Sequence, residues 1–250
     1  MNKVFLLIIS LLTASIIIAS PADSLKKANN AYASEEYGKA IKVYENILDS
    51  GNVSAPLYFN LGNAYYKSNS IPKAILNYER AKLLAPNDED IQFNLEMANQ
   101  YVIDKIDPLP QPFFVTWGEA ILNIFTSNQW AIFSIAAFVT TLILALIYLF
   151  STRIVLKKLA FGLAIFTLII SMSTLALSAR QKAKIINHNH AIIFDPTVTV
   201  KASPDQSGTD LFVIHEGLKV EIEQKLNNWV EIKLEDGNSG WVKNEVLEEI

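Results

Sequence analysis

The amino-acid sequence predicts a multidomain chain in which all-α helical repeats, a two-helix transmembrane hairpin and a small all-β barrel follow one another. Three observations predict this fold class. Two uncharged apolar runs lie at residues 130–150 and 159–179. A recurrence of small and aromatic residues at a repeat length of about 34 precedes them. Short segments of alternating apolar and polar residues follow them. The two polar domains are expected at residues 23–106 and 190–250.

Each apolar run is long enough to cross a bilayer. Each contains 21 residues. A helix of that length spans about 31 Å, close to the hydrocarbon core of about 30 Å. Buried helices of soluble proteins seldom run so far without a polar face. We therefore expect transmembrane helices at residues 129–150 and 159–179, joined by a basic loop at residues 151–158. Because neither span holds an ionisable residue, no ion or proton pathway is expected.

The N-terminus predicts an export signal over residues 1–22. Lys3 precedes an apolar stretch at residues 4–18, and Ser20-Pro21-Ala22 resembles the small-x-small cleavage signal. The mature chain would then begin at Asp23, and an uncleaved anchor is the alternative. In both cases the following domain leaves the cytoplasm.

The orientation of the hairpin follows from this signal. Two spans return the chain to the side from which it entered, so both polar domains are expected on the outer, periplasmic side of the inner (cytoplasmic) membrane. Loop charge does not decide the orientation, because basic residues are balanced between the two ends of the second span. They are Arg153, Lys157 and Lys158 at one end and Arg180, Lys182 and Lys184 at the other.

Residues 23–106 contain an internal repeat. Ala40-Ile41 returns as Ala74-Ile75, and Asn29-x-x-Tyr32 returns as Asn63-x-x-Tyr66. The period is that of a tetratricopeptide (TPR) repeat, about 34 residues, and it predicts repeats at about 21–54 and 55–88. An amphipathic segment at residues 88–105 predicts a closing helix that covers the second repeat. The second repeat carries the family pattern best, through Leu61-Gly62-x-x-Tyr65, Ala74, Tyr78, Ala81 and Pro86.

The repeat register predicts a peptide-binding groove on the first helix of each unit. Asparagine can pair with an extended backbone, and aromatic rings bury apolar side chains. The groove lacks the basic residues that would capture a free carboxylate. The alternative is that its asparagines satisfy neighbouring groups and its aromatic rings pack the repeats together. The candidate groove residues are Leu25, Asn29, Tyr32, Phe59, Asn63, Tyr66, Phe93 and Met97.

Residues 107–128 form the approach to the membrane. Pro108, Pro110 and Pro112 predict a stiff extended spacer. An internal ligand for the β-domain is the alternative interpretation of this proline run. The next residues are apolar and aromatic with Glu119 as the one charge, which predicts a short helix lying in the headgroup region.

The C-terminal residues 190–250 predict a barrel of five or six strands. Strands are expected at 191–194, 198–202, 210–214, 218–224, 229–234 and 239–242, and Asp236-Gly237 marks a hairpin turn. The segments NNWVEI and SGWVKNEVL are similar to bacterial SH3 (SH3b) domains. In that family the tryptophans that match Trp229 and Trp241 are mostly structural. The resemblance implies binding to peptides or to cell-wall glycopeptide.

Catalysis has no visible basis in the sequence. The chain has no cysteine, and its net charge of −4 argues against a nucleic-acid binder. No nucleophile elbow, phosphate loop, dinucleotide fingerprint or zinc-protease motif occurs. His188-x-His190 offers two imidazoles without carboxylate neighbours, a poor metal site. We therefore predict a non-enzyme with no catalytic residue, no metal and no cofactor.

The order of the parts carries a wider resemblance. A signal segment, a TPR pair, a D-K-I-x-P-L-P spacer with F-F-x-x-W, two spans and an SH3b domain resemble the BatE-type proteins of the Bat (aerotolerance operon) family. The resemblance implies a membrane-bound component that works beside von Willebrand A-domain and TPR-bearing Bat proteins, linked to oxidative stress or envelope integrity.

Two functional hypotheses follow from the sequence. The first is a non-catalytic scaffold or adaptor whose TPR groove holds a partner protein. The second is a cell-wall attachment protein whose SH3b domain binds peptidoglycan or peptide. No nucleic-acid partner is expected in either case.

Overall fold

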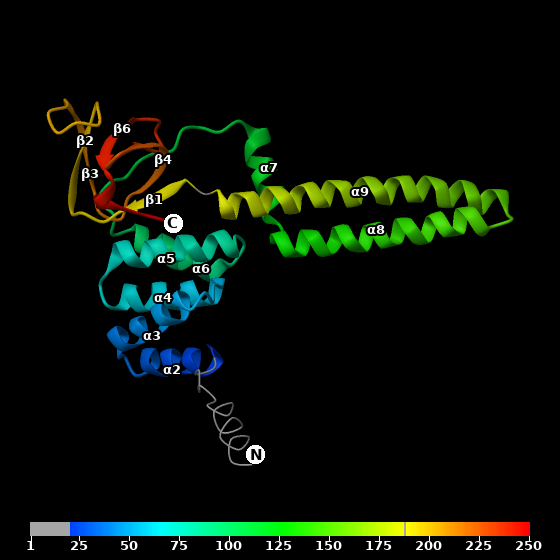
Figure 1. The fold of residues 1–250 in the computed structure, drawn as a ribbon, viewed down its shortest axis with the longest axis horizontal. Coiled ribbons are helices and arrows are strands. Elements are labelled where there is room, and N and C mark those ends of the chain that lie inside the picture. Colours follow the sequence, from blue (N-terminus) through cyan, green and yellow to red (C-terminus); the bar gives the residue numbers. More distant parts are fainter. Residues whose placement is uncertain (1–20, 188) are drawn as a thin grey trace, which may run out of the picture. The chain divides into compact units, whose positions relative to one another are not determined.

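A computed structural model describes residues 21–187 and 189–250. The signal segment expected at the N-terminus therefore lies outside the described residues except for its last two, and His188 lies outside them too. The chain divides into two compact units, Met1–Val53 and Ser54–Ile250. Figure 1 shows the order of the elements along the chain.

The first unit contains the helix pair α2 (Pro21–Ala33) and α3 (Tyr37–Asp49). Ala28 of α2 and Ala40 of α3 are fully buried, and these small side chains let two helices approach closely. Tyr44 fills the space beside them and is 1% exposed.

The second unit begins with α4 (Ala55–Lys67), α5 (Ile71–Leu84) and α6 (Glu89–Asn99). Because α2, α4 and α6 start at residues 21, 55 and 89, the helices repeat at the TPR period. Gly62 lets α4 approach α5, since a Cβ at this position would lie 2.7 Å from two ring carbons of Tyr78. The Asp88 side chain caps α6 by accepting from the backbone N–H groups of Asp90 and Ile91.

Helix α6 ends at Asn99, six residues before the predicted end of the closing helix at residue 105. Two contacts account for the early end. Lys105 Nζ donates to the carbonyl of Asn99 at 2.9 Å, which satisfies the last turn. The Asp104 carboxylate accepts from the backbone N–H of His215 at 2.6 Å and lies 2.9 Å from His215 Nδ1. The chain leaves the helix to reach this partner in the β-domain.

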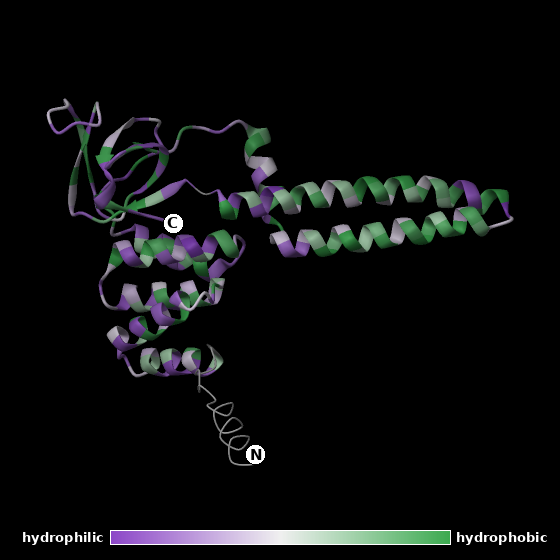
Figure 2. Cartoon of the chain, in the orientation of Figure 1, coloured by the Kyte–Doolittle hydropathy of each residue, from purple (hydrophilic) through white to green (hydrophobic). Residues whose placement is uncertain are grey.

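Three further helices follow: α7 (Phe113–Asn123), α8 (Ser127–Phe150) and α9 (Ile154–Ile186). Helices α8 and α9 are both long and apolar enough to cross a membrane, and Figure 2 shows their apolar colouring along most of their length. They fit a two-span membrane protein. Their connection is only Ser151–Arg153, shorter than the predicted loop at 151–158, because α9 starts early and contains Lys157 and Lys158. Continued helix satisfies backbone groups near lipid, and lysines can extend toward water.

Hydroxyl groups join α8 to α9 at three levels. The hydroxyl residues on α8 recur every seventh residue, which places them on one face. The contacts are Ser127 Oγ to Ser178 O at 3.0 Å, Ser134 Oγ to Ser171 O at 2.9 Å, and Thr141 Oγ1 to Thr167 Oγ1 at 2.8 Å. Small residues that hydrogen-bond across helices are the usual contacts between transmembrane helices. The hairpin is therefore held together by its own polar groups.

The C-terminal part is a seven-stranded antiparallel sheet in the order β3-β2-β6-β5-β4-β1-β7. The strands are β1 (His190–Ile193), β2 (Thr197–Lys201), β3 (Asp210–His215), β4 (Lys219–Leu226), β5 (Trp229–Lys233), β6 (Ser239–Lys243) and β7 (Leu247–Glu249). Strand β7 was not predicted, and it pairs antiparallel with β1. Alternating apolar residues of β4 and β5, among them Val220 and Ile232, form the core. The predicted fold class is confirmed.

Within the second unit, the β-domain contacts the outer face of α5. Lys219 Nζ lies 2.7 Å from Glu79 Oε2. Arg80 Nη2 donates to the Glu249 carbonyl at 2.6 Å and lies 3.1 Å from Glu248 Oε1. These contacts join the second repeat to β4 and β7.

Candidate binding surfaces

The candidate groove residues of the first unit lie on α2. Asn29 is exposed and its Oδ1 accepts a hydrogen bond of 2.7 Å from the Tyr44 hydroxyl of α3. Tyr32 is half-buried, and its ring meets the ring of Tyr37 edge-on at 5.4 Å. Leu25 is half-buried on the same helix. Asn29 thus contributes to the pairing of its own two helices.

The second unit repeats this arrangement. Asn63 Oδ1 accepts from the Tyr78 hydroxyl at 2.7 Å, and it also accepts from Asn94 Nδ2 of α6 at 2.9 Å. The Phe59 ring lies 6.0 Å from the ring of Tyr78. A spacing of four and three residues places Phe59, Asn63 and Tyr66 on one face of α4. This face is therefore continuous with α6.

Helix α6 and the residues after it carry the most exposed apolar side chains of this region. Phe93 is 63% exposed, Tyr101 is 59% exposed and Ile103 is 67% exposed. The Tyr66 ring meets the Tyr101 ring edge-on at 5.9 Å. Met97 is half-buried on α6, and its Sδ accepts a hydrogen bond of 3.7 Å from Gln100 Nε2. We call Phe59, Asn63, Tyr66, Phe93, Met97 and Tyr101 the α4/α6 surface.

The surroundings of three tyrosine hydroxyls in the two repeats raise their pKa values. Burial, with a smaller effect of Tyr32, raises the pKa of Tyr44 to about 12. Burial likewise raises the pKa of Tyr32, with Tyr37 adding to the effect. A hydrogen bond with Tyr101 is the main cause that raises the pKa of Tyr66. Neutral, hydrogen-bonded phenols suit recognition by packing and hydrogen bonding rather than proton transfer.

A second candidate surface lies in the β-domain beside Trp229. A surface pocket of about 370 Å³ is lined by Gln206, Asn228, Trp229, Lys243, Asn244 and Glu245. Trp229 is half-exposed, whereas Trp241 is only 8% exposed and packs in the core. Lys243 Nζ lies 3.1 Å from Glu245 Oε1 at the rim. The pocket therefore offers one aromatic surface surrounded by hydrogen-bonding groups, which fits a polar peptide or glycopeptide.

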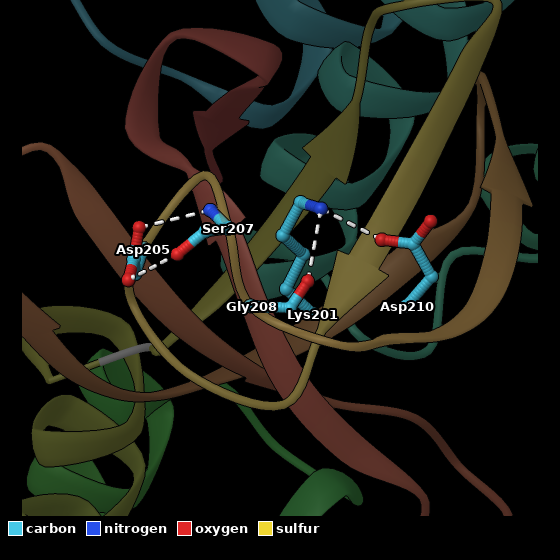
Figure 3. Close-up of polar contacts among 5 residues, drawn as sticks. All are labelled: Lys201, Asp205, Ser207, Gly208 and Asp210. Carbon is cyan, nitrogen blue, oxygen red and sulfur yellow. Dashed lines mark hydrogen bonds and ion pairs between the residues drawn. The ribbon is translucent and has the colours of Figure 1, made fainter.

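The loop between β2 and β3 brings Gln206 to this pocket. Figure 3 shows the polar contacts of Asp205 and Lys201 within this loop. Asp205 accepts from the backbone N–H of Ser207 at 2.9 Å and from its hydroxyl at 2.8 Å. These bonds lower the pKa of Asp205, the backbone bond contributing most. At the base of the loop, Lys201 Nζ lies 2.6 Å from Asp210 Oδ1 and donates to the Gly208 carbonyl at 3.2 Å. The loop conformation is thus held by its own polar groups.

Two comparisons with known families fall on these two regions. The family model described as a tetratricopeptide repeat matches residues 55–88. The family model described as a bacterial SH3 domain matches residues 196–248. No curated protein matches the chain. The TPR-plus-SH3b architecture is therefore supported, and membership of the Bat family stays a prediction.

TPR and SH3b domains are typically non-catalytic. Among the described residues, no group of three or more histidine, cysteine, aspartate or glutamate side chains is arranged to hold a metal ion.

Sequence reasoning missed the partners of the groove asparagines. Tyr44 and Tyr78 each lie fifteen residues after the asparagine that accepts from them. This spacing recurs in both repeats and was available as a signal. Asn94 also follows the repeat, since it lies 34 residues after Asn60. Tyr101 had no comparable repeat pattern, and only the packing of α6 beside α4 reveals it.

Proposed function

We propose that this chain is a membrane-anchored, non-catalytic adaptor whose α4/α6 surface binds a partner protein. The observation that carries the proposal is the exposure of Phe93 at 63%, next to the polar Asn63–Asn94 pair. Soluble proteins seldom leave a cluster of large apolar side chains in water unless a partner covers it. An apolar side chain of the partner would pack on Phe93 while its backbone meets polar groups nearby.

The finer proposal concerns the partner and the cellular setting. The order of domains and the Asp104–Trp117 spacer support a place in a Bat-type envelope complex linked to aerotolerance or stress. The partners would then be von Willebrand A-domain and TPR-bearing membrane proteins of that family.

A photo-crosslinking amino acid at position 93 tests the adaptor proposal in native membranes. Phe93 is preferred to the asparagines, because losing Asn63 would leave the buried Tyr78 hydroxyl without this acceptor. The matched control is position 226 in the β-domain, where Leu226 is 50% exposed. We expect discrete protein adducts from position 93 and none of the same mass from position 226. Equal adducts from both positions, or none from either, would contradict the proposal.

The second candidate function is cell-wall attachment through the β-domain, and the half-exposed Trp229 favours it. Sedimentation of the full detergent-solubilised chain with purified peptidoglycan tests it. Wall binding that Trp229→Ala abolishes and Leu226→Ala leaves intact would support attachment. Absence of wall binding in the unchanged protein would leave the adaptor function alone.

Both domains would lie on the outer side of the inner membrane. The signal segment supports this placement, because an even number of spans returns the chain to the side it entered. A phosphatase or fluorescent-protein fusion after Lys184 tests it. Periplasmic phosphatase activity is expected, and a fluorescent cytoplasmic fusion would rule the placement out.

A further inference from the structure

Helix α7 exposes an unusually apolar face. Trp117 is 68% exposed, Phe113 69%, Phe114 65%, Ile121 50% and Ile124, at the helix end, 51%. At 3.6 residues per turn these five side chains fall within an arc of about 100°. No charged residue lies within that arc. The Phe113 ring contacts both Phe114 and Trp117 edge-on, at 5.7 and 5.8 Å. The arc is therefore one continuous aromatic and aliphatic surface.

The opposite face of α7 is attached to the transmembrane hairpin. Leu122 is 2% exposed, and its carbonyl accepts a hydrogen bond of 3.1 Å from the indole Nε1 of Trp130 on α8. Glu119 Oε2 lies 2.5 Å from Lys184 Nζ on α9, and Glu119 Oε1 lies 4.0 Å from Arg180. Both long helices therefore hold α7, through the Leu122 carbonyl and the Glu119 carboxylate.

These contacts place α7 at the level where the apolar part of α9 ends. Arg180, a partner of Glu119, is the first charged residue after the uncharged run 159–179. The hydroxyl contact between Ser127 and Ser178 lies at the same end of the hairpin. Figure 1 shows α7 running across the base of α8 and α9 rather than along them. An apolar helix at this level and in this direction would lie in the plane of the membrane surface.

We propose that α7 binds the lipid surface, with the arc of Phe113, Phe114, Trp117, Ile121 and Ile124 inserted between lipid headgroups. The inference rests on the proposed membrane anchoring of the hairpin. Amphipathic helices that lie in the interface bury aromatic and aliphatic residues just below the headgroups, where tryptophan is enriched. The exposed surface of α7 continues toward the exposed side of α8 through Phe125, whose ring lies 4.8 Å from that of Phe133, a residue that is 46% exposed. Lipid, rather than a second protein, therefore covers it.

Single-cysteine labelling tests the proposal, because the chain contains no cysteine of its own. The full-length protein is reconstituted in phosphatidylcholine and phosphatidylglycerol vesicles. Trp117→Cys and Ile121→Cys each carry an environment-sensitive NBD label, and lipids with a nitroxide high on the acyl chain serve as quenchers. Thr116→Cys, exposed on the flank of the same helix, is the matched control. Phe138→Cys, mid-way along α8, reports the span itself.

We expect blue-shifted emission and strong loss of fluorescence at positions 117 and 121, and little quenching at 116. Position 138 should respond to a nitroxide deep in the acyl chain. Water-like emission at 117 and 121 with quenching at 138 would overturn the inference and leave the anchoring intact. Blue-shifted emission at 117 without quenching would mean that protein covers the arc, and it would overturn the inference as well. Absence of quenching at 138 would overturn the anchoring itself.

Discussion

Replacing Gly62 by alanine tests how closely α4 and α5 must pack. The added Cβ would meet Cδ1 and Cε1 of Tyr78 at 2.7 Å, a distance that real Cβ contacts essentially never show. Tyr78 is 1% exposed, and its hydroxyl is bound to Asn63, so the ring cannot swing away freely. Overpacking of a buried site costs about 1–3 kcal/mol, and two short contacts to a held ring place this site in the upper half.

The same substitution has a favourable part, because alanine is a better helix former than glycine by about 1 kcal/mol. The net loss of stability is therefore about 1–2 kcal/mol, which changes the ratio of folded to unfolded forms by about 5- to 30-fold. Gly38→Ala is the matched control. Gly38 also lies in a helix, but a Cβ there would meet nothing within 4 Å. Only the helix-propensity gain, up to about 1 kcal/mol, applies to it.

Hydrogen exchange followed by mass spectrometry measures both effects in the full-length protein. Peptides covering α4 and α5 should exchange about 5- to 30-fold faster in Gly62→Ala. Peptides covering α3 should exchange at the unchanged rate or more slowly in Gly38→Ala. If Gly62→Ala instead slows exchange in α4 and α5, the close approach of Gly62 to Tyr78 does not limit packing, and the reasoning fails.

Three further predictions concern titration and the contact of the β-domain with α5. The stabilising effect of the raised Tyr44 pKa is complete below its ordinary value of 10.0 and is lost as pH rises toward 12, so ultraviolet titration should show a late phenolate step that Tyr44→Phe removes. The hydrogen bonds that lower the pKa of Asp205 stabilise the loop above pH 3.8, the ordinary pKa of the group, and this stabilisation is lost as pH falls through the lowered pKa. Ser207→Ala should raise this pKa toward 3.8 in a carboxyl NMR titration. An unchanged pKa would show that the Ser207 hydroxyl does not contribute to the shift. Arg80→Ala removes the donor to the Glu249 carbonyl and should cost about 1 kcal/mol, seen as faster hydrogen exchange in β7 but not in β5.

The parts of the fold that were predictable depend on local pattern. The repeats were placed by their 34-residue period, and the spans by two uncharged runs. The six strands were placed by alternating apolar and polar residues between turns. Each of these signals can be found without knowing which distant residues meet in the fold. Strand β7 could not, because Leu247–Glu249 has strand structure only through its pairing with β1, more than fifty residues earlier. The end of α6 is a second example. Asp104 lies outside the helix, where it accepts a hydrogen bond from His215, 111 residues later in the chain.

The sequence predicted which groove residues share one face of each repeat, but not the hydrogen bonds that these residues make. The repeat register located the face that holds Phe59, Asn63 and Tyr66. It did not reveal that Asn63 accepts from Tyr78, since a contact between two helices depends on how closely they pack. The same bond recurs between Asn29 and Tyr44. Both asparagines therefore stabilise the pairing of helices within their own repeat. The binding proposal rests instead on the exposed side chain of Phe93.

The hydroxyl groups of the hairpin form contacts between its own two helices. Within α8 and α9, the hydroxyls of the buried Ser134 and Ser171 each donate to the backbone carbonyl of the other residue, and the hydroxyls of Thr141 and Thr167 lie 2.8 Å apart. Hydroxyl contacts of this kind stabilise the association of two helices. The apolar runs 130–150 and 159–179 hold no aspartate, glutamate, lysine, arginine or histidine of the kind that marks ion and proton pathways. The charged residues of the long helices lie near their ends, where Lys184 pairs with Glu119 of α7. We propose that a hairpin built this way acts as a tether, with recognition by the α4/α6 surface and the Trp229 pocket.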